Sequence, residues 1–204
     1  MTDHLIDDGV VKYLAIHTDG DPPTHPLLAQ LDQIRTQLFD LQLVGAYPNG
    51  IGYGNVSIRH GKGCIISGTA TGALRELSPA GYCQVQTFDI EKNTVHTMGP
   101  VPASSESMTH CAIYQSLDLI ECVLHIHHRA LWETLLKRGY PATEANIPYG
   151  TPEMANTMAL LVNHQHSPTG LMVMAGHEEG IVAYGPTVDL AFEQIQSVYS
   201  QYIQ

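Results

Sequence analysis

Charged residues are scarce in this chain, and basic ones most of all. Of its 204 residues 14% are charged, and nine Lys and Arg stand against twenty Asp and Glu, giving a net charge of −11. A nucleic-acid binder needs a basic cluster to neutralise phosphates, and the sequence contains none. We therefore predict no nucleic-acid partner. An anionic ligand must be small, held by backbone N–H groups, hydroxyls, a metal or a single Arg.

Long apolar runs and paired cysteines are also missing. No run approaches the roughly 18 residues that a membrane span requires, and the acidic N-terminus lacks the features of a signal peptide. We predict a cytoplasmic protein without a membrane partner. The cysteines form no C-x-x-C pair, and buried free thiols in a reducing cytosol are expected at Cys64, Cys83, Cys111 and Cys122.

The pattern of apolar residues predicts an α/β chain of the α+β type. With 44% apolar residues, the length predicts one domain over 1–204, with no repeat or low-complexity tract. The helical period predicts a helix over about 26–43. The other expected strands are 9–17, 55–59, 63–67, 82–90, 94–97, 120–127, 171–175 and 180–184, and further helices begin near Ser104, Arg129, Pro152 and Pro186. This order predicts a central, mostly antiparallel sheet between helical layers.

Two histidines, His125 and His127, are spaced for a metal site within a predicted strand. Residues two apart in a strand point to the same face and lie about 6.6 Å apart along it. Leu124 and Ile126 would then face the other side. Two imidazoles converging in this way can bind one zinc ion. A pair of hydrogen-bonded histidines is the alternative interpretation, and a metal site needs a third ligand.

His177 is the best candidate for that third ligand. It lies between two predicted apolar strands, where the end of a strand can present it to a cleft. His164 and His166 have the same spacing as the first pair, but their polar surroundings predict a solvated turn. His110 and His128 remain candidates for groups that support the ligands.

Glu106 follows Ser104 and Ser105 at the expected start of a helix. Ser104 is a good N-cap, which would place Glu106 in the first turn. The helix dipole there favours an ionised carboxylate by about 0.3–1 kcal/mol, and free N–H groups of that turn can receive an anion. A Glu at this position is also common for structural reasons alone.

Two glycine-containing stretches could hold a small anion. The segment 52–59 offers accessible backbone N–H groups and the Asn55 amide, and 67–72 offers hydroxyls and Gly72 in a turn. Both patterns also occur in ordinary tight turns between strands.

Taken in order, these segments resemble the class II aldolase/adducin family. The matching pieces are 54–59, 67–72, 104–106, 124–127 and the region from Gly176 to Gly185, so that the resemblance spans roughly residues 25–190. It implies a central antiparallel sheet between helical layers and a homo-oligomer, most often a tetramer. It also implies that Zn²⁺, or another divalent transition metal, is bound by His125, His127 and His177.

The resemblance further implies roles for the other segments. Glu106 would be the catalytic acid/base, and the substrate's phosphate or equivalent anion would lie near Asn55, Thr71, Gly72, Ser104 and Ser105. The sequence departs from the common pattern in three places. Glu178 and Glu179 separate His177 from the following glycine, Ala103 precedes the Ser-Ser-Glu where Pro is frequent, and about residues 1–25 form an extension without a counterpart.

The reaction that these residues would support passes through an ene-diolate of a small, phosphorylated substrate. A zinc ion with three protein ligands keeps positions open and stabilises negative charge as a Lewis acid. Glu106 would move a proton beside the carbonyl, a step worth roughly 10²–10⁴-fold in rate. Cleavage of the next C–C bond gives an aldolase, and loss of water gives a dehydratase of the methylthioribulose-1-phosphate type. A non-catalytic, adducin-like interaction module is the alternative from another class.

Overall fold

An eight-stranded sheet forms the centre of the molecule. The computed structural model describes residues 10–203. In spatial order the strands are β1 (Leu14–Asp19), β7 (Thr94–Gly99), β6 (Tyr82–Asp89), β5 (Gly63–Ser67), β4 (Asn55–His60), β8 (Cys122–His127), β10 (Gly180–Gly185) and β9 (Gly170–Val173). Neighbouring strands pair antiparallel except β1 and β7, which are parallel. The predicted, mostly antiparallel sheet is confirmed.

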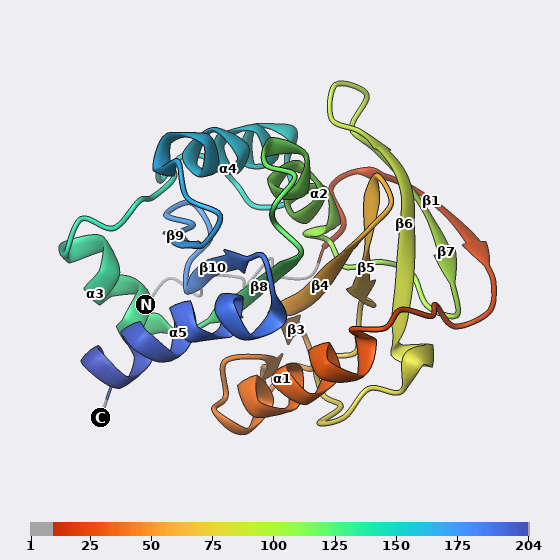
Figure 1. Cartoon of the computed structure of the whole chain (residues 1–204), viewed down its shortest axis with the longest axis horizontal. Coiled ribbons are helices and arrows are strands. Elements are labelled where there is room, and N and C mark those ends of the chain that lie inside the picture. Colours follow the sequence, from red (N-terminus) through yellow and green to blue (C-terminus); the bar gives the residue numbers. More distant parts are fainter. Residues whose placement is uncertain (1–9, 204) are drawn as a thin grey trace.

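Helices cover both faces of this sheet (Figure 1). One face packs against α1 (Leu28–Asp40), α3 (Arg129–Lys137) and α5 (Val188–Tyr202), and the other against α2 (Ser107–Ser116) and α4 (Pro152–Gln165). Each layer buries an apolar stripe, for example Leu31 and Leu38 of α1 and Met154 and Met158 of α4, all with no exposed surface. Burying such a side chain stabilises the fold by roughly 1.5–3 kcal/mol. The predicted helical layers are therefore present.

Smaller features complete the described chain. The short strands β2 (Gly45–Ala46) and β3 (Gly52–Tyr53) pair beside the main sheet, and a 3₁₀ turn spans Pro79–Gly81. The four cysteines are free and buried, as the sequence predicts. Among residues 10–203, no helix has both the length and the apolar character needed to cross a membrane.

The N-terminal strand differs from the prediction of 9–17, of which residue 9 lies outside the described residues. The strand begins only at Leu14 and extends to Asp19. Residues 10–13 leave the ladder because Tyr13 is buried against the α2–α4 layer, where its hydroxyl donates to the Ser104 carbonyl at 2.9 Å. The part of the predicted extension that is described therefore joins the sheet edge to the loop before α2.

Helix α2 also begins later than the sequence predicts. Ser104 is not its N-cap, because the helix starts at Ser107 with Glu106 in the N-cap position. The preceding residues are held in an extended conformation, since Ala103 forms an isolated bridge with Gly68 and the Thr69 N–H donates to the Pro102 carbonyl at 2.9 Å. The expectation that Glu106 lies inside the first helical turn is thus wrong, because this residue immediately precedes that turn.

Candidate functional site

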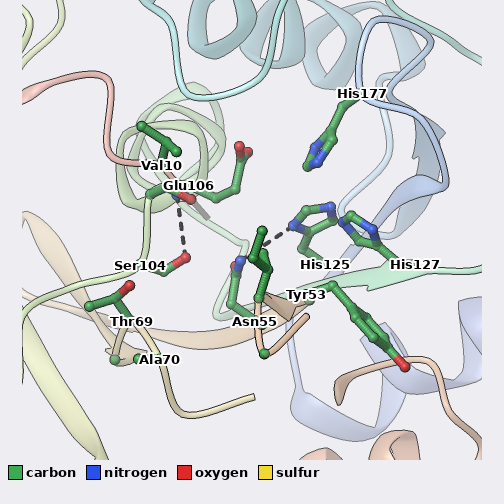
Figure 2. Close-up of a pocket in the computed structure, with 16 residues that line it drawn as sticks. Val10, Tyr53, Asn55, Thr69, Ala70, Ser104, Glu106, His125, His127 and His177 are labelled. Atoms are coloured by element: carbon green, nitrogen blue, oxygen red, sulfur yellow. Dashed lines mark hydrogen bonds between the residues drawn. The ribbon is translucent and has the colours of Figure 1, made fainter. Parts of the chain in front are cut away.

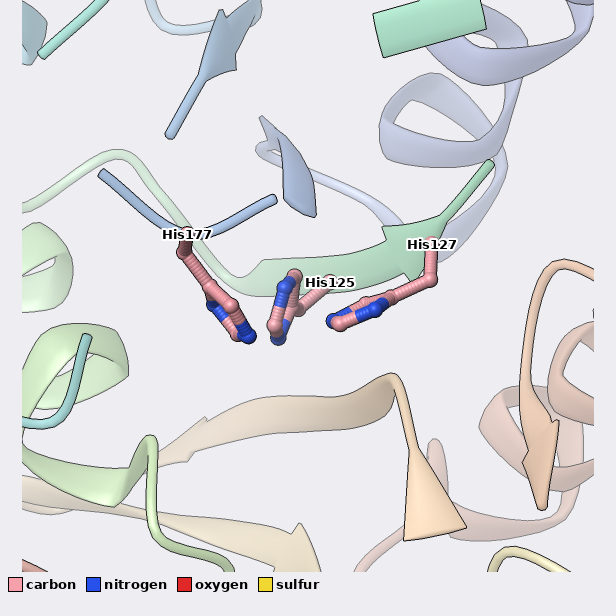
Figure 3. A group of neighbouring side chains, drawn as sticks. All are labelled: His125, His127 and His177. Carbon is pink, nitrogen blue, oxygen red and sulfur yellow. The ribbon is translucent and has the colours of Figure 1, made fainter. Parts of the chain in front are cut away.

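Three histidines from two parts of the chain meet on one side of the sheet (Figure 3). His125 and His127 point to the same face of β8, as predicted, while Leu124 and Ile126 join the core on the opposite face. His177 comes from the connection between β9 and β10. The ring centroids lie 4.8 Å (His125–His127), 5.2 Å (His125–His177) and 4.7 Å (His127–His177) apart. The three side chains therefore form one cluster that could hold a metal ion.

The connection that carries His177 is fixed by a close backbone approach. A Cβ added to Gly176 would lie 1.9 Å from the Ile147 carbonyl oxygen, so only glycine fits there. The His177 N–H donates to the Met174 carbonyl at 3.0 Å, and its own carbonyl accepts from the Gly180 N–H at 2.9 Å. The His177 ring is therefore positioned by a hydrogen-bonded turn and not by a helix or strand.

Each ring has a partner away from the centre of the cluster. The Asn55 amide lies 3.3 Å from Nδ1 of His125, and the Tyr47 hydroxyl lies 3.1 Å from Nδ1 of His127. The Tyr149 ring stacks on His177 with centroids 4.5 Å apart. These contacts leave the far nitrogens of His125 and His127 directed at the cluster.

The site fits a bound cation. Nε2 of His125 is buried and has no hydrogen-bond partner in the described part of the chain. Burial, followed by the nearby His177 and His110, holds the pKa of His125 well below its usual range, so the ring is neutral and can act as a ligand. A Cβ added to Gly180 would lie 3.2 Å from both Nε2 of His125 and Nδ1 of His177, so the glycine keeps this space open.

Metal binding at Nε2 of His125 would also fix the orientation of the Asn55 amide. A metal on Nε2 leaves the proton of His125 on Nδ1, which then needs an acceptor. The Asn55 oxygen is buried without a hydrogen-bond partner among the described residues, and turning the amide by 180° brings it to Nδ1. The amide N–H groups would then be available to a ligand in the pocket.

A pocket of about 280 Å³ opens beside the histidines (Figure 2). Its walls are residues 50–55, the turn 68–70, residues 104–106 and Val10, together with the three histidines. Glu106 is 2% exposed, and its side chain reaches into this pocket (Figure 2). Its backbone N–H donates to Oγ of Ser104 at 3.3 Å. No Lys or Arg lines the described pocket.

The structure brings most of the predicted site residues together, with two exceptions. Asn55, Ser104, Ser105, Glu106 and the three histidines all line the pocket. Thr71 and Gly72 are not among the residues that line it. The Thr71 hydroxyl donates to the Gly68 carbonyl at 2.8 Å, and Gly72 packs against the backbone of Gly45 and Gly52. Contact of these two residues with a substrate stays a prediction.

Several residues of the site were not found by sequence reasoning. Val10, Tyr47 and Tyr149 line or support it, although none belongs to a recognisable motif. Of the two supporting candidates, His110 donates to or accepts from Ser57 at 2.7 Å through Nδ1, and His128 instead caps α3 by accepting from the Leu131 N–H. The exposed His164 and His166 end α4, away from the pocket.

Comparison with known proteins places this architecture in a family. The model of the class II aldolase and adducin N-terminal domain matches residues 49–200. No curated protein matches the chain significantly. An L-fuculose 1-phosphate aldolase structure shares 20% identity, with 88% of this chain and 86% of that chain covered and a TM-score of 0.63.

Two further solved structures have the same fold. The L-fuculose-1-phosphate aldolase from Thermus thermophilus is 22% identical over 86% of this chain and 87% of that chain, with a TM-score of 0.54. A sugar-phosphate aldolase from Thermotoga maritima is 16% identical over 84% and 89%, with a TM-score of 0.60. Identities this low support the shared fold alone. Because the family model covers most of its length, the chain belongs to the class II aldolase and adducin N-terminal domain family.

Proposed function

We propose that this chain is a zinc-dependent lyase of the aldolase type, acting on a small sugar phosphate or a related hydroxy-carbonyl compound. The observation that carries the proposal is that Glu106 and the three histidines face one small pocket. An interaction module has no need of a buried carboxylate beside three buried imidazoles. The sugar-phosphate aldolases among the structural neighbours favour the aldolase over the dehydratase.

His125, His127 and His177 would hold the metal through neutral ring nitrogens. Zinc bound there supplies a Lewis acid that stabilises negative charge on substrate oxygens. Nitrogen ligands suit zinc but also other divalent transition metals.

Glu106 would act as the acid/base that moves a proton beside the substrate carbonyl. Its carboxylate is nearly fully buried, which keeps water from competing for the proton. In the cleavage direction, the Glu106 carboxylate would take the proton of a substrate hydroxyl, the neighbouring C–C bond would break, and the same proton would pass from Glu106 to the carbon that keeps the electron pair. An aldehyde and a ketone would then leave the site.

The substrate's anionic group would be held by neutral donors. Thr69, Ser104 and Ser105 and the backbone of the turn 68–70 line the wall, where Lys and Arg are absent from the described lining. Helix α2 begins beside this wall, so its positive end favours an anion there. A substrate with a single small phosphate suits such a site and its volume of about 280 Å³.

Metal content and product analysis test this function. Purified protein should carry about one zinc per chain, and His125→Ala, His127→Ala or His177→Ala should lose it. His164→Ala, which removes an exposed histidine at the end of α4, is the matched control and should keep it. A screen of phosphorylated ketoses should yield an aldehyde. Loss of water without C–C cleavage would identify the dehydratase instead. Protein that does not bind added zinc would refute the metal site.

We also propose that the protein is a homo-oligomer, namely a tetramer with closed symmetry. Its support is the low charged fraction and a set of large apolar side chains that are exposed in the single chain, including Leu14, Leu74, Leu119 and Leu160. Light scattering at micromolar concentration should give four times the chain mass. A monomeric mass would contradict the proposal.

A further inference from the structure

A chain of hydrogen bonds leads from His127 to a carboxylate on the loop that carries His177. The Tyr47 hydroxyl lies 3.1 Å from Nδ1 of His127 and donates to Oε2 of Glu179 at 2.9 Å. A carboxylate only accepts, so the single hydroxyl proton is committed to Glu179. The oxygen of Tyr47 can then only accept from His127. Nδ1 therefore carries the ring proton, and the lone pair is on Nε2.

Glu179 is held in place from several sides. Its carbonyl accepts from the His128 N–H at 3.1 Å, and Oε1 accepts from Nε of Arg129 at 3.2 Å. Its backbone has a φ of 73°, a left-handed conformation that a residue with a side chain rarely adopts. These contacts hold Glu179 in a conformation that it would otherwise avoid. Its side chain is 20% exposed, whereas that of the neighbouring Glu178 is 56% exposed.

Tyr47 is equally constrained at the other end. Its N–H donates to the Ile51 carbonyl at 2.8 Å, which closes the turn between β2 and β3. Its ring lies against Tyr53, with centroids 4.6 Å apart. Tyr53 is also close to His127, at 5.6 Å between ring centroids, but its hydroxyl donates to the Gln42 carbonyl instead. The Tyr47 hydroxyl therefore contacts the histidine, and the Tyr53 hydroxyl does not.

We propose that Tyr47 and Glu179 are positioning residues that prepare His127 to bind the metal. A histidine ligand needs one ring nitrogen without a proton, and a partner on the other nitrogen fixes the tautomer and the ring orientation and raises the basicity of the ligand. Here the carboxylate acts through a tyrosine hydroxyl, and it belongs to the turn that presents His177. The pair thus couples two of the three ligands. This inference rests on the proposed zinc site.

Zinc affinity tests the inference without a substrate. Competition with a chelator gives the zinc Kd of the whole chain and of Tyr47→Phe, with Tyr53→Phe as the matched control. Tyr47→Phe should weaken zinc about 10- to 100-fold, the usual effect of removing such a partner, while Tyr53→Phe should stay near wild type. Glu179→Gln should have a smaller effect, because the amide oxygen still accepts from Tyr47, and Glu178→Gln should have none. The spectrum of bound Co²⁺ should change in Tyr47→Phe and not in Tyr53→Phe.

The outcomes separate this inference from the proposed function. Wild-type protein that binds no zinc would overturn both. Wild-type affinity in both Tyr47→Phe and Glu179→Gln, with an unchanged Co²⁺ spectrum, would overturn the positioning role alone. If Tyr47→Phe does not fold, the zinc Kd values of Glu179→Gln and Glu178→Gln test the positioning role instead. Equal zinc Kd values in that pair would refute the role, and weaker binding in Glu179→Gln alone would support it.

Discussion

Replacing Glu106 by Gln separates its chemical role from its structural one. The two side chains have nearly the same shape, but Gln cannot take up or release the substrate's proton. Loss of an acid/base costs roughly 10²–10⁴-fold in rate, which corresponds to about 2.7–5.4 kcal/mol in the barrier. As a charge at the start of α2, Glu106 contributes about 0.3–1 kcal/mol to stability, a gain that its burial opposes. The catalytic effect should therefore exceed the structural one severalfold.

The assay measures kcat, zinc content and the unfolding midpoint on one preparation of Glu106→Gln. We expect full zinc, a midpoint close to wild type and a kcat lowered by roughly 100-fold or more, the range of general acid–base catalysis. Glu153→Gln makes the same change at an exposed site in the first turn of α4 and should keep its activity. Wild-type kcat with full zinc would refute the role of Glu106. Loss of zinc would instead identify the carboxylate as a fourth ligand.

Two further changes test the metal cluster and its surroundings. Gly180→Ala places a methyl group 3.0 Å from the His177 carbonyl oxygen and 3.2 Å from Nε2 of His125 and Nδ1 of His177, so it should lower zinc affinity. Full zinc occupancy in this variant would contradict the expectation. Burial lowers the pKa of His110 to about 3, so the unfolded chain binds a proton at higher pH than the folded chain does. The free energy of unfolding should therefore fall as the pH drops from about 6.5 to about 3. In metal-free protein, His110→Asn should reduce this slope by up to about 1.4 kcal/mol per pH unit, and identical slopes in urea titrations would show that His110 does not titrate in this way.

Most of the sheet follows from local patterns in the sequence. Alternation places His125 and His127 on one face of β8, and the apolar period of α1 matches its buried side chains. These features are predictable because a strand or helix imposes its period on any residues that it contains. The place of His177 in the cluster was also predictable, since two apolar strands flank this residue.

The errors occur where distant contacts override local preference. Ser104 is a good N-cap by type, but a bridge from Ala103 to Gly68 delays the helix to Ser107. Residues 10–13 have strand-forming side chains, yet burial of Tyr13 draws them out of the ladder. Tyr47 and Tyr149 reach the site only through tertiary packing, and no spacing in the sequence connects them with the histidines 80 or 28 residues away.

The site combines a wall next to the edge strand β1, where local unfolding costs little free energy, with a histidine cluster at the centre of the sheet, where it costs much more. Strand β8, which carries His125 and His127, is buried along its whole length and lies between β4 and β10. Over residues 10–19, by contrast, only Tyr13 has a buried side chain, although Val10 forms part of the pocket wall. Local opening reactions range from nearly zero free energy at such edges to the global value in the core. Amide hydrogens of β1 should therefore exchange with solvent deuterium long before those of β8. The pocket wall at Val10 can open locally while the histidine cluster keeps its structure.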